Sequence, residues 1–155
     1  MPLFNPVSPI NLPANGQINL TLPTLDGQCT GHVSSSWAAG YSSAAADLVF
    51  LGSSSKWLEA DANAVATCKG LLGIALEAKT DTQIMKVALP GSMVHFDAWA
   101  WNPGAQLYAS GTLGGITETA PVAEGADTQI KVIGFAVDAD TIFFNPSPDQ
   151  QSTVA

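Results

Sequence analysis

The sequence contains no arginine. Its five basic residues are all lysines, and thirteen aspartates and glutamates give the 155-residue chain a formal net charge of −8. Arginine supplies the planar, two-pronged contacts that proteins use to bind phosphates and bases, and the five lysines are too scattered to form a basic stripe. We therefore expect no nucleic acid partner. The same absence leaves no arginine finger for phosphoryl transfer.

Long apolar segments are also missing. No apolar run reaches the length of a membrane span, and the N-terminus has neither the basic start nor the apolar block of a signal peptide. We expect a soluble protein with no membrane partner that is not secreted by the usual route. Cysteine is scarce: Cys29 and Cys68 lie far apart and lack metal-ligand spacing. The spacing does not decide whether they form a disulfide, and two free buried thiols are the favoured alternative.

The composition that is present fits one domain with a core of its own. Apolar residues make up 46% of the chain, and only 12% of the residues are charged. A surface with so few charges is weakly solvated for an isolated monomer. We therefore expect partner molecules to cover part of it.

A short segment occurs twice in the chain. Leu72–Ala78 (LGIALEA) matches Ile133–Ala139 (IGFAVDA), and upstream Asp47–Gly52 (DLVFLG) matches Gln106–Gly111 (QLYASG). Solenoids usually need at least three repeats to bury their faces, so two copies favour a small barrel or sandwich. The sequence thus predicts a mainly β fold built from a duplicated β unit.

The chain begins with a proline-rich segment, residues 1–28. Its prolines prevent a helix and a long central strand, so we expect an extended arm with one edge strand within Gln17–Leu22. A flexible tail and an arm docked on another protein both remain open, and the apolar content favours docking. The candidate contact residues of this arm are Leu3, Phe4, Val7, Ile10 and Leu12.

The remainder is expected to form a single β domain, residues 29–147, with related halves at about 44–90 and 103–146 and a C-terminal tail at 148–155. Expected strands lie near residues 47–51, 56–60, 70–77, 83–89, 92–98, 106–109, 115–118, 129–137 and 141–144. His32–Ala46 is expected to be a loop, and Asp61–Lys69 has weak helical periodicity. Gly73 and Gly134, inside predicted strands, indicate a bulge or a close backbone approach.

The sequence offers few residue patterns that are typical of a catalytic or metal site. His32 and His95 have no metal-ligand partner at motif spacing, although His95 and Asp97 can pair on one strand face. No nucleophile elbow surrounds any serine. Glu77 and Asp138 occupy equivalent positions in the two copies, which favours a duplicated structural role over paired catalytic carboxylates. We expect no enzyme, no cofactor and no metal, and rank a small β hydrolase last.

Aromatic residues cluster after the predicted strand 92–98. Alternation places Trp99 and Trp101 on one face, close to Phe96. Such side chains fill a subunit interface, anchor in a core or stack on sugars. Because Pro103–Gly104 follows at once, an interior or interface anchor is favoured over an open ligand platform.

Three segments of the first copy carry a resemblance to a known family. Asp47–Leu51, Lys56–Ala62 and Gly70–Leu76 resemble the strand, hairpin return and Gly-Ile-Ala-Leu strand of the small capsid decoration proteins of tailed bacteriophages. The resemblance covers about residues 44–145. The chain departs from that pattern in having Ala46 before Asp47, where glycine is common, and in its longer arm.

The resemblance implies a structural virion protein that binds and stabilises the outside of a capsid. It implies the major capsid protein as partner, a homotrimer, synthesis in the host cytoplasm, and no catalytic residues. The candidate capsid or subunit contacts are then the apolar arm residues together with Trp99 and Trp101. The alternative is a tail-fibre or receptor-binding domain with these two tryptophans as a sugar platform.

Overall fold

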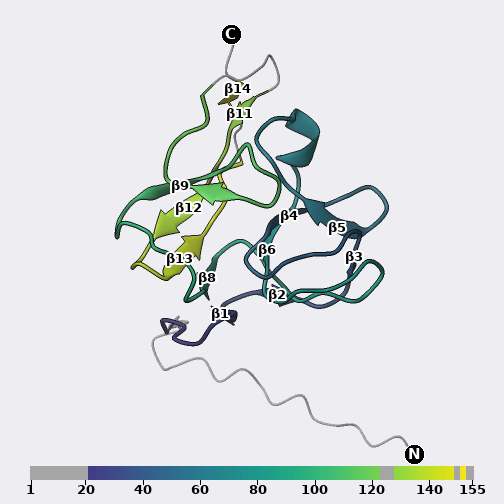
Figure 1. Cartoon of the computed structure of the whole chain (residues 1–155), viewed down its shortest axis with the longest axis horizontal. Helices are drawn as coiled ribbons and strands as arrows, with labels where there is room; N and C mark the ends of the chain where they lie inside the picture. Colours follow the sequence, from purple (N-terminus) through teal and green to yellow (C-terminus); the bar gives the residue numbers. More distant parts are fainter. Residues whose placement is uncertain (1–20, 123–127, 149–150, 153–155) are drawn as a thin grey trace, which may run out of the picture.

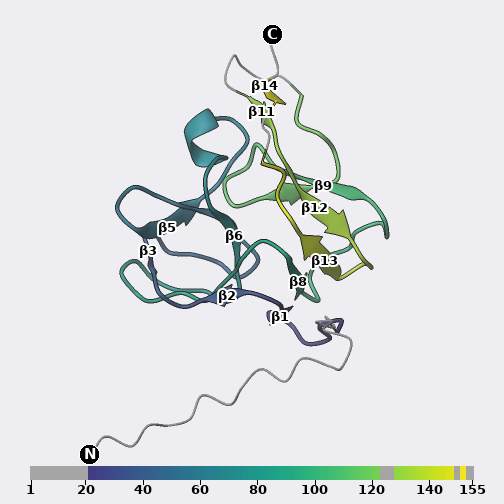
Figure 2. The same ribbon diagram turned by 180° about the vertical axis from the view of Figure 1, so that it is seen from behind.

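The computed structural model describes residues 21–122, 128–148 and 151–152, and these residues form a mainly β structure without an α-helix. Sheet A has the strand order β1-β8-β13-β12-β9-β10 and sheet B the order β2-β7-β6-β4-β5-β3, and β11 pairs with β14. Figures 1 and 2 show the two large sheets side by side, with the β11–β14 pair at one end. Within the described residues, no helix has the length and apolar character needed to cross a membrane.

The strands are short. Their bounds are β1 Gln28–Thr30, β2 Val33–Ser34, β3 Ala38–Ala39, β4 Leu48–Leu51, β5 Lys56–Glu59, β6 Leu72–Ala75, β7 Val87–Ala88, β8 Ser92–His95, β9 Gln106–Ala109, β10 Ile116–Thr117, β11 Gln129–Ile130, β12 Val132–Ala136, β13 Thr141–Phe144 and β14 Gln151–Ser152, with a 3-10 helix η1 at Val65–Thr67.

The duplication seen in the sequence is a duplication of strand topology. In sheet B the first copy gives the antiparallel order β5-β4-β6-β7, and in sheet A the second copy gives β10-β9-β12-β13. The repeated Gly-containing segments form β6 and β12, the third strand of each unit. Each copy is therefore a four-stranded antiparallel unit, and the expected mainly β fold with two related halves is confirmed.

Sheet B curls toward closure into a small barrel. Its edge strand β3 runs parallel to β5, and Ala38 also bridges to Ile84 in the segment that precedes β7. The backbone N–H of Ala39 donates to the Gln83 carbonyl at 2.9 Å, which joins the two ends of the sheet. The enclosed cluster of fully buried side chains comprises Ala39, Val49, Trp57, Ala75, Met85 and Val87.

The larger core lies between the two sheets. Alternation along β4 sends Leu48 into this core and Val49 into the barrel of sheet B, so one strand supports both clusters. From sheet A the core receives Leu107, Ile142 and Phe144, all fully buried. The two copies thus pack against each other through apolar side chains that share one interior.

A bulge makes the two copies differ on their outer faces. The register of β12 against β9 shifts between Val132 and Gly134, and Gly134 has φ +152°. A bulge adds one residue to a strand and reverses the side-chain alternation beyond it. Phe135 is consequently 47% exposed, whereas Ile74, its counterpart in the first copy, is fully buried.

Gly73, the other repeated glycine, allows a close approach instead. A Cβ added to Gly73 would lie 2.2 Å from Cγ1 of Val87 and 3.5 Å from the Trp57 ring. The missing side chain makes room for both inside the barrel. Gly73 therefore allows a close approach alone, whereas Gly134 combines the bulge with a close approach to the Phe143 backbone.

Most predicted strands are present, and the differences have simple causes. His32–Ala46, expected to be a loop, contains β2 and β3, which at two residues each are too short to show periodicity. The expected strand at 83–89 is regular only at Val87–Ala88. The weak helical pattern of 61–69 corresponds to the single turn of η1.

The two ends of the chain are described only in part. The arm residues 1–20 lie outside the described residues, including most of the edge strand expected within 17–22; Thr21 and Leu22 are irregular. The root of the arm contacts the domain, since the Gly27 N–H donates to the His95 carbonyl at 2.9 Å. In the segment expected to be a tail, Gln151–Ser152 forms β14 and pairs with β11.

Candidate contact surface and pocket

An apolar row crosses the outer face of sheet A. Phe135 pairs with Phe143, and Phe143 pairs with Met93, so the three side chains stand next to one another on the same face. Phe143 and Met93 are half-buried, and Phe135 is exposed. Large apolar side chains that adjoin on a sheet surface are typical of a protein contact site. We call Met93, Phe143 and Phe135 the outer row.

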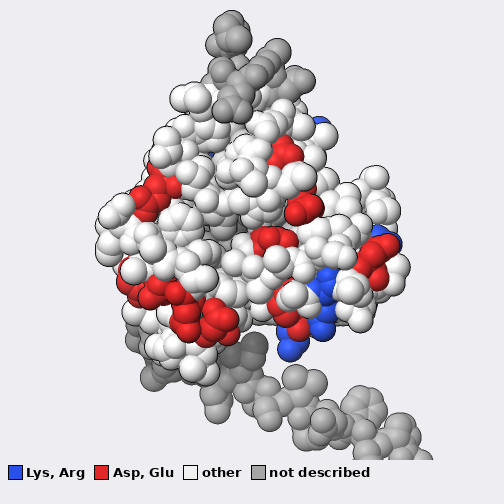
Figure 3. Space-filling model, viewed as in Figure 1, with Lys and Arg blue, Asp and Glu red and all other residues white. Residues whose placement is uncertain are grey.

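The charges of the described surface are mostly negative. Figure 3 shows carboxylates spread over one face and a few lysine atoms beside carboxylates. Two lysines are paired: Lys56 with Asp81 at 2.9 Å and Lys79 with Glu77 at 3.3 Å. Lys56 lowers the pKa of Asp81, chiefly through this hydrogen bond. These two ion pairs reduce the positive charge that the described surface offers to an anionic partner.

Trp99 and Trp101 are half-buried against the core between the sheets. The Phe96 and Trp99 rings meet edge to face with centroids 5.0 Å apart, and Trp101 follows at 5.8 Å from Trp99. The indole N–H of Trp101 is buried and has no hydrogen-bond partner in the described structure. This geometry fits the anchor interpretation better than an open sugar platform. The other predicted contacts, in the arm, lie outside the described residues.

His95 does form the pair with Asp97 that the sequence left open. His95 Nε2 and Asp97 Oδ1 are 2.8 Å apart, and Nδ1 is 3.0 Å from the Thr141 hydroxyl. The backbone N–H of Asp97 donates to Asp26 at the root of the arm. The imidazole therefore links β8 to β13, and Asp97 links the same segment to the root of the arm.

Tyr41 and Asp47 hold the loop before the first copy against its first strand. The Tyr41 hydroxyl donates to Asp47 Oδ2 at 2.7 Å, and the Ala44 N–H donates to the same oxygen at 2.8 Å. Burial, then the hydrogen bond and negative charge of Asp47, raise the pKa of Tyr41. The phenol therefore stays protonated and keeps donating across the neutral range.

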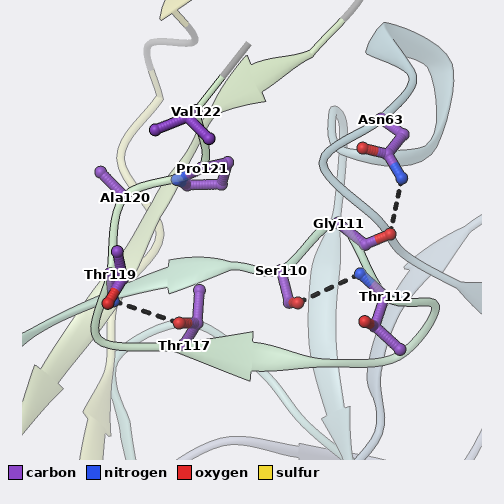
Figure 4. Close-up of a pocket in the computed structure, with 9 residues that line it drawn as sticks. All are labelled: Asn63, Ser110, Gly111, Thr112, Thr117, Thr119, Ala120, Pro121 and Val122. Atoms are coloured by element: carbon purple, nitrogen blue, oxygen red, sulfur yellow. Dashed lines mark hydrogen bonds between the residues drawn. The ribbon is translucent and has the colours of Figure 1, made fainter. Parts of the chain in front are cut away.

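A pocket of about 330 Å³ lies beside the β9–β10 hairpin. Figure 4 shows Thr117 to Val122 along one side of its opening and Asn63, Gly111 and Thr112 along the other. All nine described lining residues are uncharged: Asn63, Ser110, Gly111, Thr112, Thr117, Thr119, Ala120, Pro121 and Val122.

No pattern in the sequence predicted this pocket. Asn63 and the hairpin are far apart in the chain, and the contact between Asn63 Nδ2 and the Gly111 carbonyl, at 2.6 Å, brings them together. A side chain at Gly111 would press on Asn63, because an added Cβ would lie 3.0 Å from Asn63 Oδ1. The density of Ser and Thr around the hairpin is the only signal the sequence offered.

Among the described residues, no group of three or more His, Cys, Asp and Glu side chains is placed to hold a metal ion. Cys29 and Cys68 are not joined in a disulfide, and burial raises the pKa of Cys68 to about 11. The chain matches no protein-family model, no curated protein sequence and no solved structure.

Proposed function

We propose that this protein is a structural, non-catalytic component of a tailed-phage virion that binds the outside of the capsid and stabilises it. The observation that carries the proposal is the repeated four-stranded unit. The three segments with the family resemblance form β4, β5 and β6, which are neighbours in one sheet, and the second copy forms β9, β10, β12 and β13 of sheet A.

The outer row supplies the contact surface in this proposal. The first copy covers the corresponding face of its own sheet by curling into a barrel, but the outer face of sheet A leaves Phe135 exposed and Phe143 and Met93 half-buried. Burying an exposed aromatic side chain contributes about 1.5–3 kcal/mol, enough for such a row to anchor an interface. We propose that it contacts the major capsid protein, and that three copies of the chain associate on the shell.

The stabilisation follows from mass action. A protein that binds the assembled shell and not the dissociated subunits adds about 2.7 kcal/mol per site when its free concentration is a hundred times the Kd. The anionic surface without arginine suits an exterior position away from packaged DNA. The arm, with its apolar residues, provides a second contact in the proposal.

The first experiment measures copy number. Quantitative mass spectrometry of purified particles that contain this chain is expected to give hundreds of copies, near the number of major shell subunits. A handful of copies per particle would contradict a decoration role. That result would instead favour a location on the tail, as in the receptor-binding alternative.

The second experiment tests the outer row. Phe135→Asp is expected to remove the protein from the shell, because it places a charge in the contact. Leu113→Asp is the matched control, since Leu113 is 57% exposed in the β9–β10 hairpin, outside the row. Sedimentation velocity distinguishes a contact with the capsid protein from a contact between copies of the chain. Loss of the trimer in Phe135→Asp would assign the outer row to the interface between copies. Full shell binding by Phe135→Asp would exclude the outer row from both interfaces.

A further inference from the structure

We infer that the pocket beside the β9–β10 hairpin is a binding site for a neutral saccharide. This inference goes beyond decoration and does not depend on it. It rests on the chemistry of the lining, which presents hydroxyl and amide groups from three chain segments around an opening of about 330 Å³. That volume is at the small end of the range of ligand pockets and suits one or two sugar rings.

Several polar groups of the lining have hydrogen-bonding capacity to spare. Asn63 uses its Nδ2 to bind the Gly111 carbonyl, and no described residue binds its Oδ1. The hydroxyls of Thr112 and Thr119 make no hydrogen bond within the described structure. Each hydroxyl offers both a donor and an acceptor, which is the arrangement that a sugar hydroxyl requires.

Two further hydroxyls are already oriented by the backbone. The Thr112 N–H donates to the Ser110 hydroxyl oxygen, and the Thr119 N–H donates to the Thr117 hydroxyl oxygen, both at 3.1 Å. Each of these oxygens accepts from the protein and retains its own O–H as a donor to a ligand. Ordering of this kind before binding lowers the entropic cost of the contact.

The lining also selects against other classes of ligand. It has no lysine for an anion and no carboxylate for a cation among its described residues. An apolar ligand would leave the hydroxyls without water or a partner, which costs free energy. Ala120, Pro121 and Val122 form an apolar border that fits the C–H face of a sugar ring. A neutral polyhydroxylated ligand satisfies both parts of the site.

The test uses saturation-transfer NMR on the full chain with glucose, galactose, mannose, rhamnose and N-acetylglucosamine. Each is present at about 10 mM, to match the millimolar affinity expected of a small contact. At least one of these sugars is expected to bind, and glucose 6-phosphate is expected to bind more weakly than glucose. Failure of all five to bind, or tighter binding of the phosphorylated sugar, would overturn the inference.

A double variant locates the site. Thr112→Val with Thr119→Val removes two hydroxyls that the fold does not use and keeps the side-chain volume, so the protein is expected to fold normally. Loss of two hydrogen bonds predicts affinity at least about tenfold weaker. The matched control is Thr24→Val with Thr80→Val, two exposed threonines outside the pocket. If both double variants bind the sugar equally more weakly, or if neither does, the result would contradict the assignment of the pocket as the binding site.

Discussion

Replacing Gly134 with alanine tests the central structural argument, that one glycine turns Phe135 out of the core. A Cβ at Gly134 would lie 2.0 Å from the Phe143 carbonyl oxygen and 3.2 Å from the Asn145 nitrogen. Both atoms belong to backbone, so no rotamer change relieves the overlap. The φ of +152° is, in addition, a conformation that alanine rarely adopts.

The expected cost is the sum of these two effects. A strained backbone conformation costs about 1–3 kcal/mol, and overpacking adds about 1–3 kcal/mol. Gly134→Ala should therefore lower the free energy of unfolding by about 2–6 kcal/mol, a large part of the roughly 5–15 kcal/mol typical of a domain. With a urea m-value of about 2 kcal/mol/M, the unfolding midpoint should fall by about 1–3 M.

Gly70→Ala is the matched control for backbone strain alone. Gly70 has φ +77°, and a Cβ there would meet nothing within 4 Å. The left-handed conformation costs about 1–2 kcal/mol, partly offset by the lower entropy of the unfolded chain. Urea unfolding followed by tryptophan fluorescence compares the two variants. A Gly134→Ala protein as stable as Gly70→Ala would refute the argument that β13 confines this position.

Three other predictions concern side chains whose pKa is shifted. Burial and Asp47 raise the pKa of Tyr41 above 10, the value of a free tyrosine. The contribution of Tyr41 to the free energy of unfolding is therefore complete below pH 10 and is lost as the pH rises toward the pKa of the folded state. Tyr41→Phe should lower the free energy of unfolding by about 1–2 kcal/mol at pH 7 and remove this alkaline decline, as measured by urea unfolding. Lys56→Ala should raise the pKa of Asp81 toward its ordinary value with little change in stability, which a carbon NMR titration measures, and an unchanged titration would contradict the ion pair. The buried Cys68 thiol, with a pKa of about 11, should react with iodoacetamide at pH 8 only after unfolding in urea, and rapid reaction of the native protein would contradict its burial.

Much of the fold was predictable because it depends on local patterns. The duplicated segment located β4, β6, β9 and β12, since apolar and β-branched residues between glycines favour strands wherever they occur. The absence of a disulfide between the two cysteines was likewise the favoured alternative. The strands β2 and β3 were not predictable, because two-residue strands form only where a neighbouring strand offers hydrogen bonds.

The candidate surfaces were less predictable, because they depend on contacts between distant residues. Strand alternation predicted that Trp99 and Trp101 share one face, but both residues lie beyond the end of β8, and their half-burial depends on the core from both sheets. The outer row combines β8, β12 and β13, and the pocket combines Asn63 with Gly111, which lies 48 residues further along the chain in the hairpin. Such combinations have no signature in any single segment.

The sequence by itself determined the strand-forming units, their duplication and the charge of the surface, because propensity, repetition and composition are properties of residues and their neighbours. Only the tertiary structure decided how the copies differ. In the first copy the sheet closes and buries Trp57 and Val49; in the second, the bulge at Gly134 reverses the alternation and exposes Phe135. The physical reason is register: a shift of one residue moves a side chain from the core to the surface, and register is set by the partner strand.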